Sequence, residues 1–326
     1  MIFQDILERW QKVNVLVLGD VMIDRYMQGK VNRISPEAPV PVFDHLHTAN
    51  HLGGAANVAL NCHALGARTY LCGVTGKDQE ALIFNQLLAD HGLSSEGTIS
   101  LSTRRTTLKT RLMAGEHHVL RIDQEQREDL SKKEEMELLR RIHILLDQAK
   151  IQVVILQDYN KGVLTTSIIK ELIAVCHERN IKVTVDPKQR NFFEYKGVDL
   201  FKPNLQELQN ALQQTIPSET EQLLHARERL MARMPHHHTL ITLGNQGLVY
   251  FQDPHLIRKE AIPIRIHDVC GAGDTVISIA SLALTIGLPA EQIAQLANQA
   301  AAWVCTQPGV VPVDPEALRS SNGFKD

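Results

Sequence analysis

A short glycine-rich segment carries the clearest chemistry in this sequence: DVCGAGDT at residues 268–275, followed directly by an apolar stretch. Gly271, Ala272 and Gly273 have almost no side chain, so a turn here can bring successive backbone N–H groups close to an anion at the start of a helix. Asp274 follows at once, and a carboxylate beside a bound phosphate suits a base that takes the proton of an attacking hydroxyl. The segment indicates phosphoryl transfer, although the helix dipole alone would also favour an acid at this position.

The composition favours small-molecule chemistry in a large α/β domain. The chain has 326 residues, 44% hydrophobic and 22% charged, which is enough to bury a large core. A net charge of −3, with scattered Lys and Arg, gives no basic footprint for nucleic acid. The five cysteines lack CxxC or zinc-like spacing, which predicts buried thiols in a reducing compartment and therefore a cytoplasmic protein. The acidic N-terminal residues do not fit a signal peptide, and the apolar run at 276–288 is too short for a bilayer, so no membrane contact is expected.

The elements that must position this segment follow an α/β pattern. Apolar runs at 13–19, 153–156 and 181–185 predict buried strands, and a helix is expected over 165–178. Such alternation is typical of right-handed βαβ units, so we predict an open α/β domain with a mostly parallel sheet flanked by helices. Parallel strands bring their carboxyl ends to one edge, where ligands bind. The polar residues expected at that edge are Asp24, Asp158, Lys161, Asp186 and Lys188. Asp24 is also compatible with an ordinary turn.

Two β-rich insertions interrupt the α/β pattern, at 25–52 and 101–123. Residues 1–24, 53–100 and 124–326 would form the α/β core. We expect the insertions to pair in one small sheet that acts as a lid over the strand ends. The apolar residues expected on the outer face of this lid are Val40, Val42, Leu108 and Leu112. An exposed apolar sheet invites edge pairing, so the lids of two chains are expected to pack as a homodimer.

Two segments place small residues next to polar ones. In GGAAN at 53–57, Gly53 and Gly54 permit a close approach, and the amide of Asn57 can offer a donor and an acceptor to a polyol, although Asn57 also suits a helix start. This spacing is not the GxGxxG dinucleotide fingerprint. The spacing of Asn204 and Glu207 predicts, in the first place, a capping box at the start of a helix.

A tight turn that could accommodate a nucleotide follows a strand over 239–243. The triple histidine before it, at 236–238, predicts a solvated loop rather than a metal site, because adjacent residues cannot converge as ligands.

Three motifs together resemble the signatures of the PfkB or ribokinase-like sugar kinases. They are GGAAN at 53–57, NxxE at 204–207 and DxxGAGD at 268–274, whose order and spacing agree across nearly the whole chain. The resemblance implies a doubly wound α/β domain with a β lid, Mg-ATP as phosphoryl donor, Asp274 as base and the preceding Gly-Ala-Gly as anion hole. Cys270 stands where the family usually has threonine, and Gln307-Pro-Gly309 replaces a more usual Lys-x-Gly.

Within that family, three further stretches resemble the kinases that phosphorylate heptose 7-phosphate on its anomeric hydroxyl. These stretches are GDVMIDRY at 19–26, RISPEAPVPV at 33–42 and DYNKG at 158–162. The bifunctional relatives also carry a nucleotidyltransferase domain, and no HxGH motif occurs in this sequence, so the kinase alone is expected. Two alternatives stay open: a kinase for another sugar or sugar phosphate, and a non-catalytic sugar-binding regulator of the same fold.

The resemblance also implies roles for individual residues. Asn204 and Glu207 would lie near the triphosphate and the waters of its Mg²⁺, with no direct protein ligand to the metal. The adenosine site would be lined by Thr242, Gly244, Gly247 and Asn298. The sugar would be held by Asp24, Gly53, Gly54 and Asn57. A dependence on monovalent cations stays open.

The phosphate of a phosphorylated acceptor needs a cation, because a dianion in a closed cleft without a partner costs several kcal/mol. The candidates are Lys109, Arg111, Lys161, Lys188 and Arg190. We expect Arg111, from the lid, and Lys161, from the strand-end rim, to bind this phosphate.

Overall fold

A computed structural model describes residues 3–115, 117–253 and 255–321. Within these residues, nine strands form the main sheet in the order β13-β12-β11-β10-β9-β8-β1-β4-β5. The bounds are β1 Asn14–Gly19, β4 Arg68–Gly76, β5 Thr98–Leu101, β8 Val153–Gln157, β9 Lys182–Asp186, β10 Leu200–Phe201, β11 His238–Thr242, β12 Leu248–Gln252 and β13 His255–Lys259. All neighbours pair in parallel except β11 with β12 and β12 with β13. The predicted doubly wound, mostly parallel sheet is confirmed.

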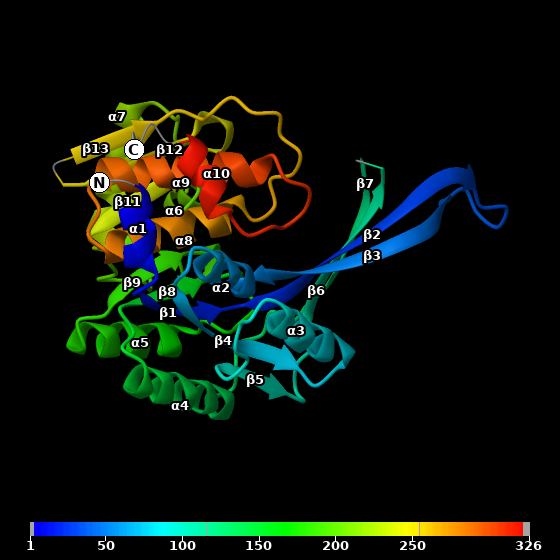
Figure 1. Ribbon diagram of the computed structural model, residues 1–326, viewed down its shortest axis with the longest axis horizontal. Helices are drawn as coiled ribbons and strands as arrows, with labels where there is room; N and C mark the ends of the chain where they lie inside the picture. The colour runs from blue at the N-terminus through cyan, green and yellow to red at the C-terminus, as the bar shows by residue number, and fades with distance from the viewer. Residues whose placement is uncertain (1–2, 116, 254, 322–326) are drawn as a thin grey trace.

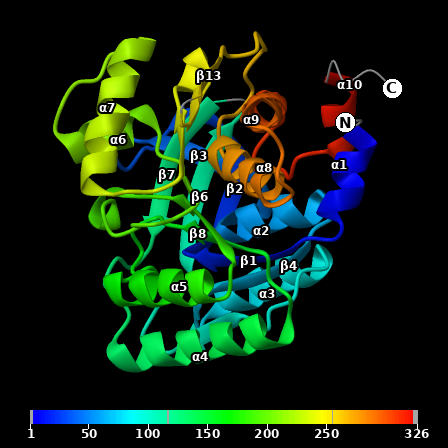
Figure 2. The same cartoon turned by 90° about the vertical axis from the view of Figure 1, so that its left-hand side faces the viewer.

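Helices cover both faces of this sheet (Figure 2). They are α1 Phe3–Trp10, α2 Ala55–Ala64, α3 Gln79–Asp90, α4 Lys132–Gln148, α5 Thr166–Glu178, α6 Leu205–Leu212, α7 Thr220–Arg233, α8 Ala272–Thr285, α9 Ala290–Cys305 and α10 Pro315–Ser321, with short 3-10 turns η1 Gln189–Asn191 and η2 Gly244–Gln246. Strand β1 shows why two layers form. Val15 and Val17 belong to the core cluster under α1, α2, α8 and α9, whereas Leu16 and Leu18 belong to the cluster under α4 to α7. Side chains alternate across a strand, so an all-apolar strand needs cover on both faces.

A second, smaller sheet projects from the main body as a long arm (Figure 1). Its strands are β2 Val21–Ile34, β3 Pro41–Gly54, β6 Thr107–Ala114 and β7 His117–Gln124, in the order β3-β2-β6-β7. The two β-rich insertions therefore pair with each other, through the parallel contact of β2 with β6. Strand β5, at the start of the second β-rich region, instead pairs with β4 in the main sheet.

Some local predictions are wrong. His236 is not in a solvated loop: its side chain is buried, and its ring nitrogens lie 2.8 Å from the Met234 carbonyl oxygen and 2.6 Å from the Thr239 hydroxyl. Burial lowers the pKa of His236 to about 4, so the ring is neutral. Of the five cysteines, Cys270 and Cys305 are only half-buried.

Candidate active site

The carboxylate of Asp274 is held by three hydrogen bonds near the start of α8. Asn57 Nδ2, from α2, donates to Asp274 Oδ2 at 2.8 Å. The other oxygen, Oδ1, accepts from Tyr159 Oη at 2.8 Å and from Gln157 Nε2 at 3.1 Å. Gln157 ends β8 and Tyr159 follows it, so the carboxyl edge of the sheet supplies two of the three donors. Two of the three motifs of the sequence resemblance, those containing Asn57 and Asp274, thus meet in one contact.

The environment of Asp274 suits a general base. The side chain is buried, and burial raises the pKa of this carboxyl to about 6, with the nearby charge of Asp186 acting in the same direction. The hydrogen bonds from Asn57 and Tyr159 oppose the rise. A base with a pKa close to the working pH is ionised at neutral pH yet still binds a proton well. The group can therefore remove a proton from a bound hydroxyl.

The glycine-rich turn lies directly before this base. Gly271 caps α8 in the left-handed conformation, with φ of 81°, and a Cβ added there would lie 2.9 Å from Asn57 Nδ2. Ala272 and Gly273 form the first turn of α8, where backbone N–H groups have no partner within the helix. These groups and the helix dipole make the turn an anion site. Glycine at 271 is required by both the backbone conformation and the packing against Asn57.

Two lysines lie among the acids around this turn. Lys202 Nζ lies 3.0 Å from Asp186 Oδ2 and is almost completely buried. Lys188 forms an ion pair with Glu207, and its Nζ lies 5.5 Å from the centre of the Tyr159 ring. Burial alone would lower the pKa of Lys188, but the carboxylates of Asp186 and Glu207 outweigh it and raise the pKa. Lys188 is therefore a cation beside the base.

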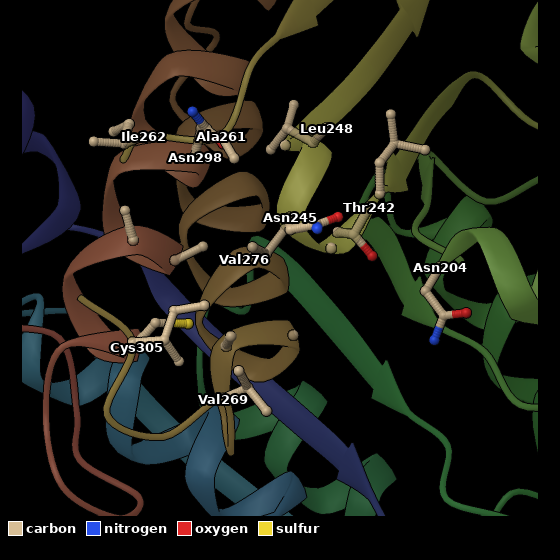
Figure 3. Close-up of a pocket in the computed structure, with 18 of the residues that line it drawn as sticks. Asn204, Thr242, Asn245, Leu248, Ala261, Ile262, Val269, Val276, Asn298 and Cys305 are labelled. Carbon is tan, nitrogen blue, oxygen red and sulfur yellow. The ribbon is translucent and has the colours of Figure 1, made fainter. Parts of the chain in front are cut away.

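A cavity of about 820 Å³ opens next to Gly273, between the β10–β12 end of the sheet and helices α8 and α9 (Figure 3). Its lining includes the expected residues Asn204, Thr242, Gly244, Gly247, Ala272, Gly273 and Asn298. Its walls are mainly apolar, with Leu248, Ile262, Ile264, Val269 and Val276 among them. A pocket of this size, apolar with a few polar groups and an anion site at one end, matches the shape and chemistry of a nucleoside triphosphate.

Local structure explains several of these positions. Asn204 and Glu207 form a complete capping box at the start of α6: Asn204 Oδ1 accepts from the Glu207 N–H at 2.8 Å, and Glu207 Oε2 accepts from the Asn204 N–H at 2.9 Å. Gly247 has φ of 88°, and a Cβ there would lie 1.9 Å from the Lys259 carbonyl oxygen, so only glycine fits. Glu207 does not line the cavity, because its side chain turns to Lys188.

The residues expected to hold the sugar lie where the small sheet meets the core. Asp24, on β2, forms a buried ion pair with Arg111 on β6. Gly53, on β3, pairs with Met22 of β2, and a Cβ there would lie 2.1 Å from Asp24 Oδ2. Gly54 has φ of 60° directly before α2, which carries Asn57. Of this group, Asn57 contacts Asp274 directly, and the cation Arg111 is already paired with Asp24.

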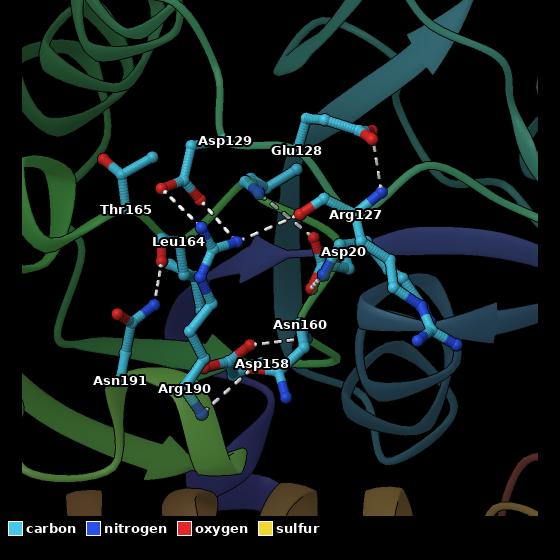
Figure 4. Close-up of polar contacts among 12 residues, drawn as sticks. Asp20, Arg127, Glu128, Asp129, Asp158, Asn160, Leu164, Thr165, Arg190 and Asn191 are labelled. Carbon is cyan, nitrogen blue, oxygen red and sulfur yellow. Dashed lines mark hydrogen bonds and ion pairs between the residues drawn. The ribbon is translucent and has the colours of Figure 1, made fainter.

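Lys161 belongs to the loop that leaves β8. The buried carboxylate of Asp20 organises this loop by accepting the backbone N–H groups of Tyr159, Lys161 and Val163 at 2.8, 3.1 and 3.2 Å. Lys161 Nζ lies 2.6 Å from Glu125 Oε2. A second hollow, of about 410 Å³, is lined by this loop. Figure 4 shows the polar contacts around it.

Sequence reasoning missed four residues of this region: Arg127, Gln157, Tyr159 and Lys202. A signal existed for Gln157, because an amide at the end of the otherwise apolar strand VVILQ is unusual unless it has a polar partner. Tyr159 lay inside the DYNKG stretch, in which only the charged residues drew attention. Nothing in the local sequence marks Lys202 or Arg127.

Among the residues that the structure describes, no group of three or more His, Cys, Asp or Glu side chains is placed to hold a metal ion. In the same residues, no helix combines the length and the apolar character needed to cross a membrane.

Comparison with known proteins places this geometry in a family. The model of the pfkB family carbohydrate kinases matches residues 12–317. The bifunctional protein HldE of Desulfatibacillum aliphaticivorans is 37% identical over 309 residues, covering 94% of this chain but only 62% of that protein.

Solved structures share the fold. Phosphofructokinase-2 from Escherichia coli in complex with potassium has a TM-score of 0.77 at 17% identity, over 94% of this chain and 97% of that one. Ribokinase of Arabidopsis thaliana, complexed with ribose and ATP, has a TM-score of 0.73 at 19% identity, over 95% and 99%. The family match and the 37% identical relative show that this chain belongs to the PfkB family of carbohydrate kinases, enzymes that transfer a phosphoryl group to a hydroxyl acceptor.

Proposed function

We propose that this kinase transfers the γ-phosphoryl group of Mg-ATP to the anomeric hydroxyl of D-glycero-D-manno-heptose 7-phosphate, giving the 1,7-bisphosphate on the way to ADP-heptose. One observation carries the proposal: the buried Asp274 carboxylate has a neighbour in the lining of each of two hollows. Its neighbour Gly273 lines the large one, and its hydrogen-bond donor Tyr159 lines the small one. A base in this position can serve a donor on one side and an acceptor on the other.

The large cavity would hold ATP. Its apolar walls suit adenine, Asn298 and Thr242 supply polar contacts for the nucleoside, and the Gly271–Gly273 turn would bind the phosphates. Asn204 lines this cavity and Glu207 pairs with Lys188 beside it. Both would lie near the triphosphate, where Mg²⁺ would be bound through ATP oxygens and water rather than by direct protein ligands. The metal would neutralise charge on the donor's phosphates.

The chain's own residues then divide the work of the reaction. Asp274 accepts the proton of the acceptor hydroxyl. Its Oδ1 already accepts two hydrogen bonds whereas Oδ2 accepts one, from Asn57, so Oδ2 has a lone pair free for this proton. The first turn of α8 and the Lys188 ammonium stabilise negative charge on the transferred phosphoryl group. Each group is fixed before the substrate arrives, which is the source of the rate enhancement.

The acceptor would be bound by Asp24, Gly53, Gly54 and Asn57. A carboxylate and an amide beside two glycines let a polyol approach the backbone closely and hydrogen-bond on one face. The heptose phosphate assignment is supported by the DYNKG and ISPEAPVPV stretches and by the 37% identity to an HldE protein.

The small sheet would act as a lid that excludes water from ATP, because the open carboxyl edge of the main sheet has no cover of its own. The outer part of this lid exposes apolar side chains: Ile34 is 70% exposed, Val40 51%, Leu46 64% and Leu120 55%. Leu108 is not among them, since it is buried within the protomer, contrary to expectation. We propose that a second copy covers this face in a two-fold homodimer.

A substrate panel tests the proposed activity. The kinase is assayed with Mg-ATP and matched heptose, hexose and pentose phosphates, and kcat/KM is compared for each. We expect the heptose 7-phosphate to give the highest value. A fructose or ribose phosphate that exceeds it by tenfold or more, as about 1.4 kcal/mol of extra transition-state binding would produce, assigns the enzyme to another sugar phosphate.

A further inference from the structure

The smaller hollow beside the base carries more positive than negative charge. Its lining consists of Arg127, Tyr159, Asn160, Lys161 and Arg190. These residues come from three separate segments: the stretch before α4, the loop after β8, and η1 after β9. Two arginines and a lysine converge on one cavity of about 410 Å³. Like charges gathered from separate segments repel one another, so such a cluster favours an anionic ligand.

The carboxylates around the hollow do not use up its donors. Glu125 is shared by Lys161, at 2.6 Å, and Arg127, at 2.8 Å. Arg190 pairs with Asp129 at 3.0 Å and also donates to the backbone carbonyl oxygen of Arg127 at 3.0 Å. Three cations thus share two carboxylates, and each guanidinium has five N–H donors. The side chains of Arg127 and Arg190 are 73% and 47% exposed, so both are accessible to a ligand from solvent.

Tyr159 connects this hollow to the base. Its hydroxyl donates to Asp274 Oδ1 at 2.8 Å, and the residue also lines the hollow. Lys109, from the small sheet, extends over the same ring with its Nζ 5.4 Å from the ring centre. A molecule whose hydroxyl reaches Asp274 can therefore lie along Tyr159 and place its other end among Arg127, Lys161 and Arg190. The large cavity, which has Gly273 in its lining, shares no lining residue with this hollow, so the two ligands would occupy separate sites.

We propose that Arg127, Lys161 and Arg190 bind the phosphate group of the acceptor, and that this contact makes a sugar phosphate a better substrate than the free sugar. The inference rests on the proposed function and adds to it the residues that select the substrate class. Guanidinium groups bind phosphate through two parallel N–H bonds, which supplies direction as well as charge. Arg111 is excluded from this role because it does not line this hollow and is held by Asp24 in a buried pair between β2 and β6.

Variants of the two exposed arginines test the assignment. Lys161→Ala would leave the nearly buried Glu125 without its closest partner and disturb the fold, whereas Arg127→Ala and Arg190→Ala remove solvent-exposed groups. Each should raise KM for the sugar phosphate by about 10- to 100-fold, the loss expected for one charge-assisted pair. The kcat at saturation and KM for ATP should stay within about twofold of the wild type. Arg190→Lys should recover only part of the loss, since it keeps the charge but not the planar fork.

A matched control and a second acceptor make the result specific. Arg179→Ala removes an arginine of similar exposure, paired with Asp147 at 2.6 Å at the end of α5, away from the carboxyl edge of the sheet, and should change neither KM. The same sugar without its phosphate should be a poor substrate of the wild type, and Arg127→Ala and Arg190→Ala should leave its kcat/KM unchanged. An equal loss on both sugars, or no loss on either, overturns the inference.

Inorganic phosphate separates this inference from the proposed function. Calorimetric titration of the full chain with phosphate should show binding that the Arg127→Ala/Arg190→Ala double variant weakens at least tenfold, as loss of about 1.4 kcal/mol would do. If the wild type phosphorylates no sugar phosphate but shows this difference, the proposed function fails and the anion site stands. If sugar phosphates are phosphorylated and both proteins bind phosphate equally, the inferred site is wrong and the kinase assignment stands.

Discussion

Replacing Asp274 by asparagine should make the protein more stable while it lowers turnover by about 10²–10⁴-fold. The folded state holds this carboxyl at a pKa of about 6, against 3.8 for the group in solution. The difference of about two units corresponds to about 3 kcal/mol that ionised Asp274 costs the native state. The asparagine variant carries no charge and avoids this cost. In the variant, the new amide N–H₂ can face the N–H₂ of Asn57, so one donor lacks an acceptor. This loss reduces the gain in stability by about 1 kcal/mol. The expected net gain is about 2 kcal/mol at pH 7.5.

The pH dependence of this gain follows from the direction of the shift. A carboxyl whose folded pKa is raised binds its proton more tightly when folded, so the wild type loses stability as the pH rises from about 4 to about 6. The advantage of Asp274→Asn should be complete above pH 6 and should vanish near pH 4. Urea-unfolding midpoints of both proteins at several pH values measure it.

A second carboxylate provides the control with the opposite sign. Although its partial burial acts in the other direction, hydrogen bonds from Thr106 and Ala81 hold the pKa of Asp78 below its usual value. Asp78→Asn should therefore lower stability at neutral pH, and its deficit should shrink in acid. If Asp274→Asn is less stable than the wild type at pH 7.5, with no dependence on pH, Asp274 is a structural cap and the reasoning about a buried base is refuted.

Three further predictions address other parts of the site. Tyr159→Phe removes a hydrogen bond that lowers the pKa of Asp274, so the acidic limb of the kcat/KM–pH profile should move up by about one unit; an unmoved limb would separate Tyr159 from the base. Gly247→Ala places a Cβ against the Lys259 carbonyl oxygen and should raise KM for ATP much more than KM for the sugar, whereas equal changes would argue against a nucleotide in the large cavity. In sedimentation at micromolar concentration the protein should be a dimer that Ile34→Asp, at a 70% exposed position of the small sheet, converts to monomer; a monomeric wild type would contradict the lid-to-lid contact.

The sequence predicted those parts of the fold that depend on local patterns. Apolar strands alternating with helices need cover on both faces of the sheet, as doubly wound sheets and barrels provide, and the structure has the open, doubly wound form. Strand-like alternation and several prolines in 25–52 excluded helices there. The second insertion shows the same alternation, and its strand β6 pairs with β2 of the first. The GAGD turn was recognisable because its glycines serve a backbone requirement, seen now in the φ of 81° at Gly271.

What the sequence could not give depends on contacts between distant segments. Gln157 and Tyr159 reach Asp274 from another strand end, more than a hundred positions away along the chain, so no spacing rule reveals them. From the sequence, Arg111 was expected to be a cation available to the substrate. In the structure β2 pairs with β6, and this pairing brings Asp24 into an ion pair with Arg111. His236 was expected in a solvated loop. The sequence does not show that the Thr239 hydroxyl offers its ring a polar partner that allows burial.

The position of the new phosphate tests the central claim most directly. The wild-type kinase is incubated with Mg-ATP and D-glycero-D-manno-heptose 7-phosphate, and the product is examined by phosphorus and carbon NMR beside a reaction with Asp274→Asn. We predict one new phosphate, coupled to the anomeric carbon, with the 7-phosphate unchanged, and a rate in the variant lower by about 10²–10⁴-fold. A phosphate on any other hydroxyl, ATP hydrolysis without transfer, or near-normal turnover by the variant would contradict it.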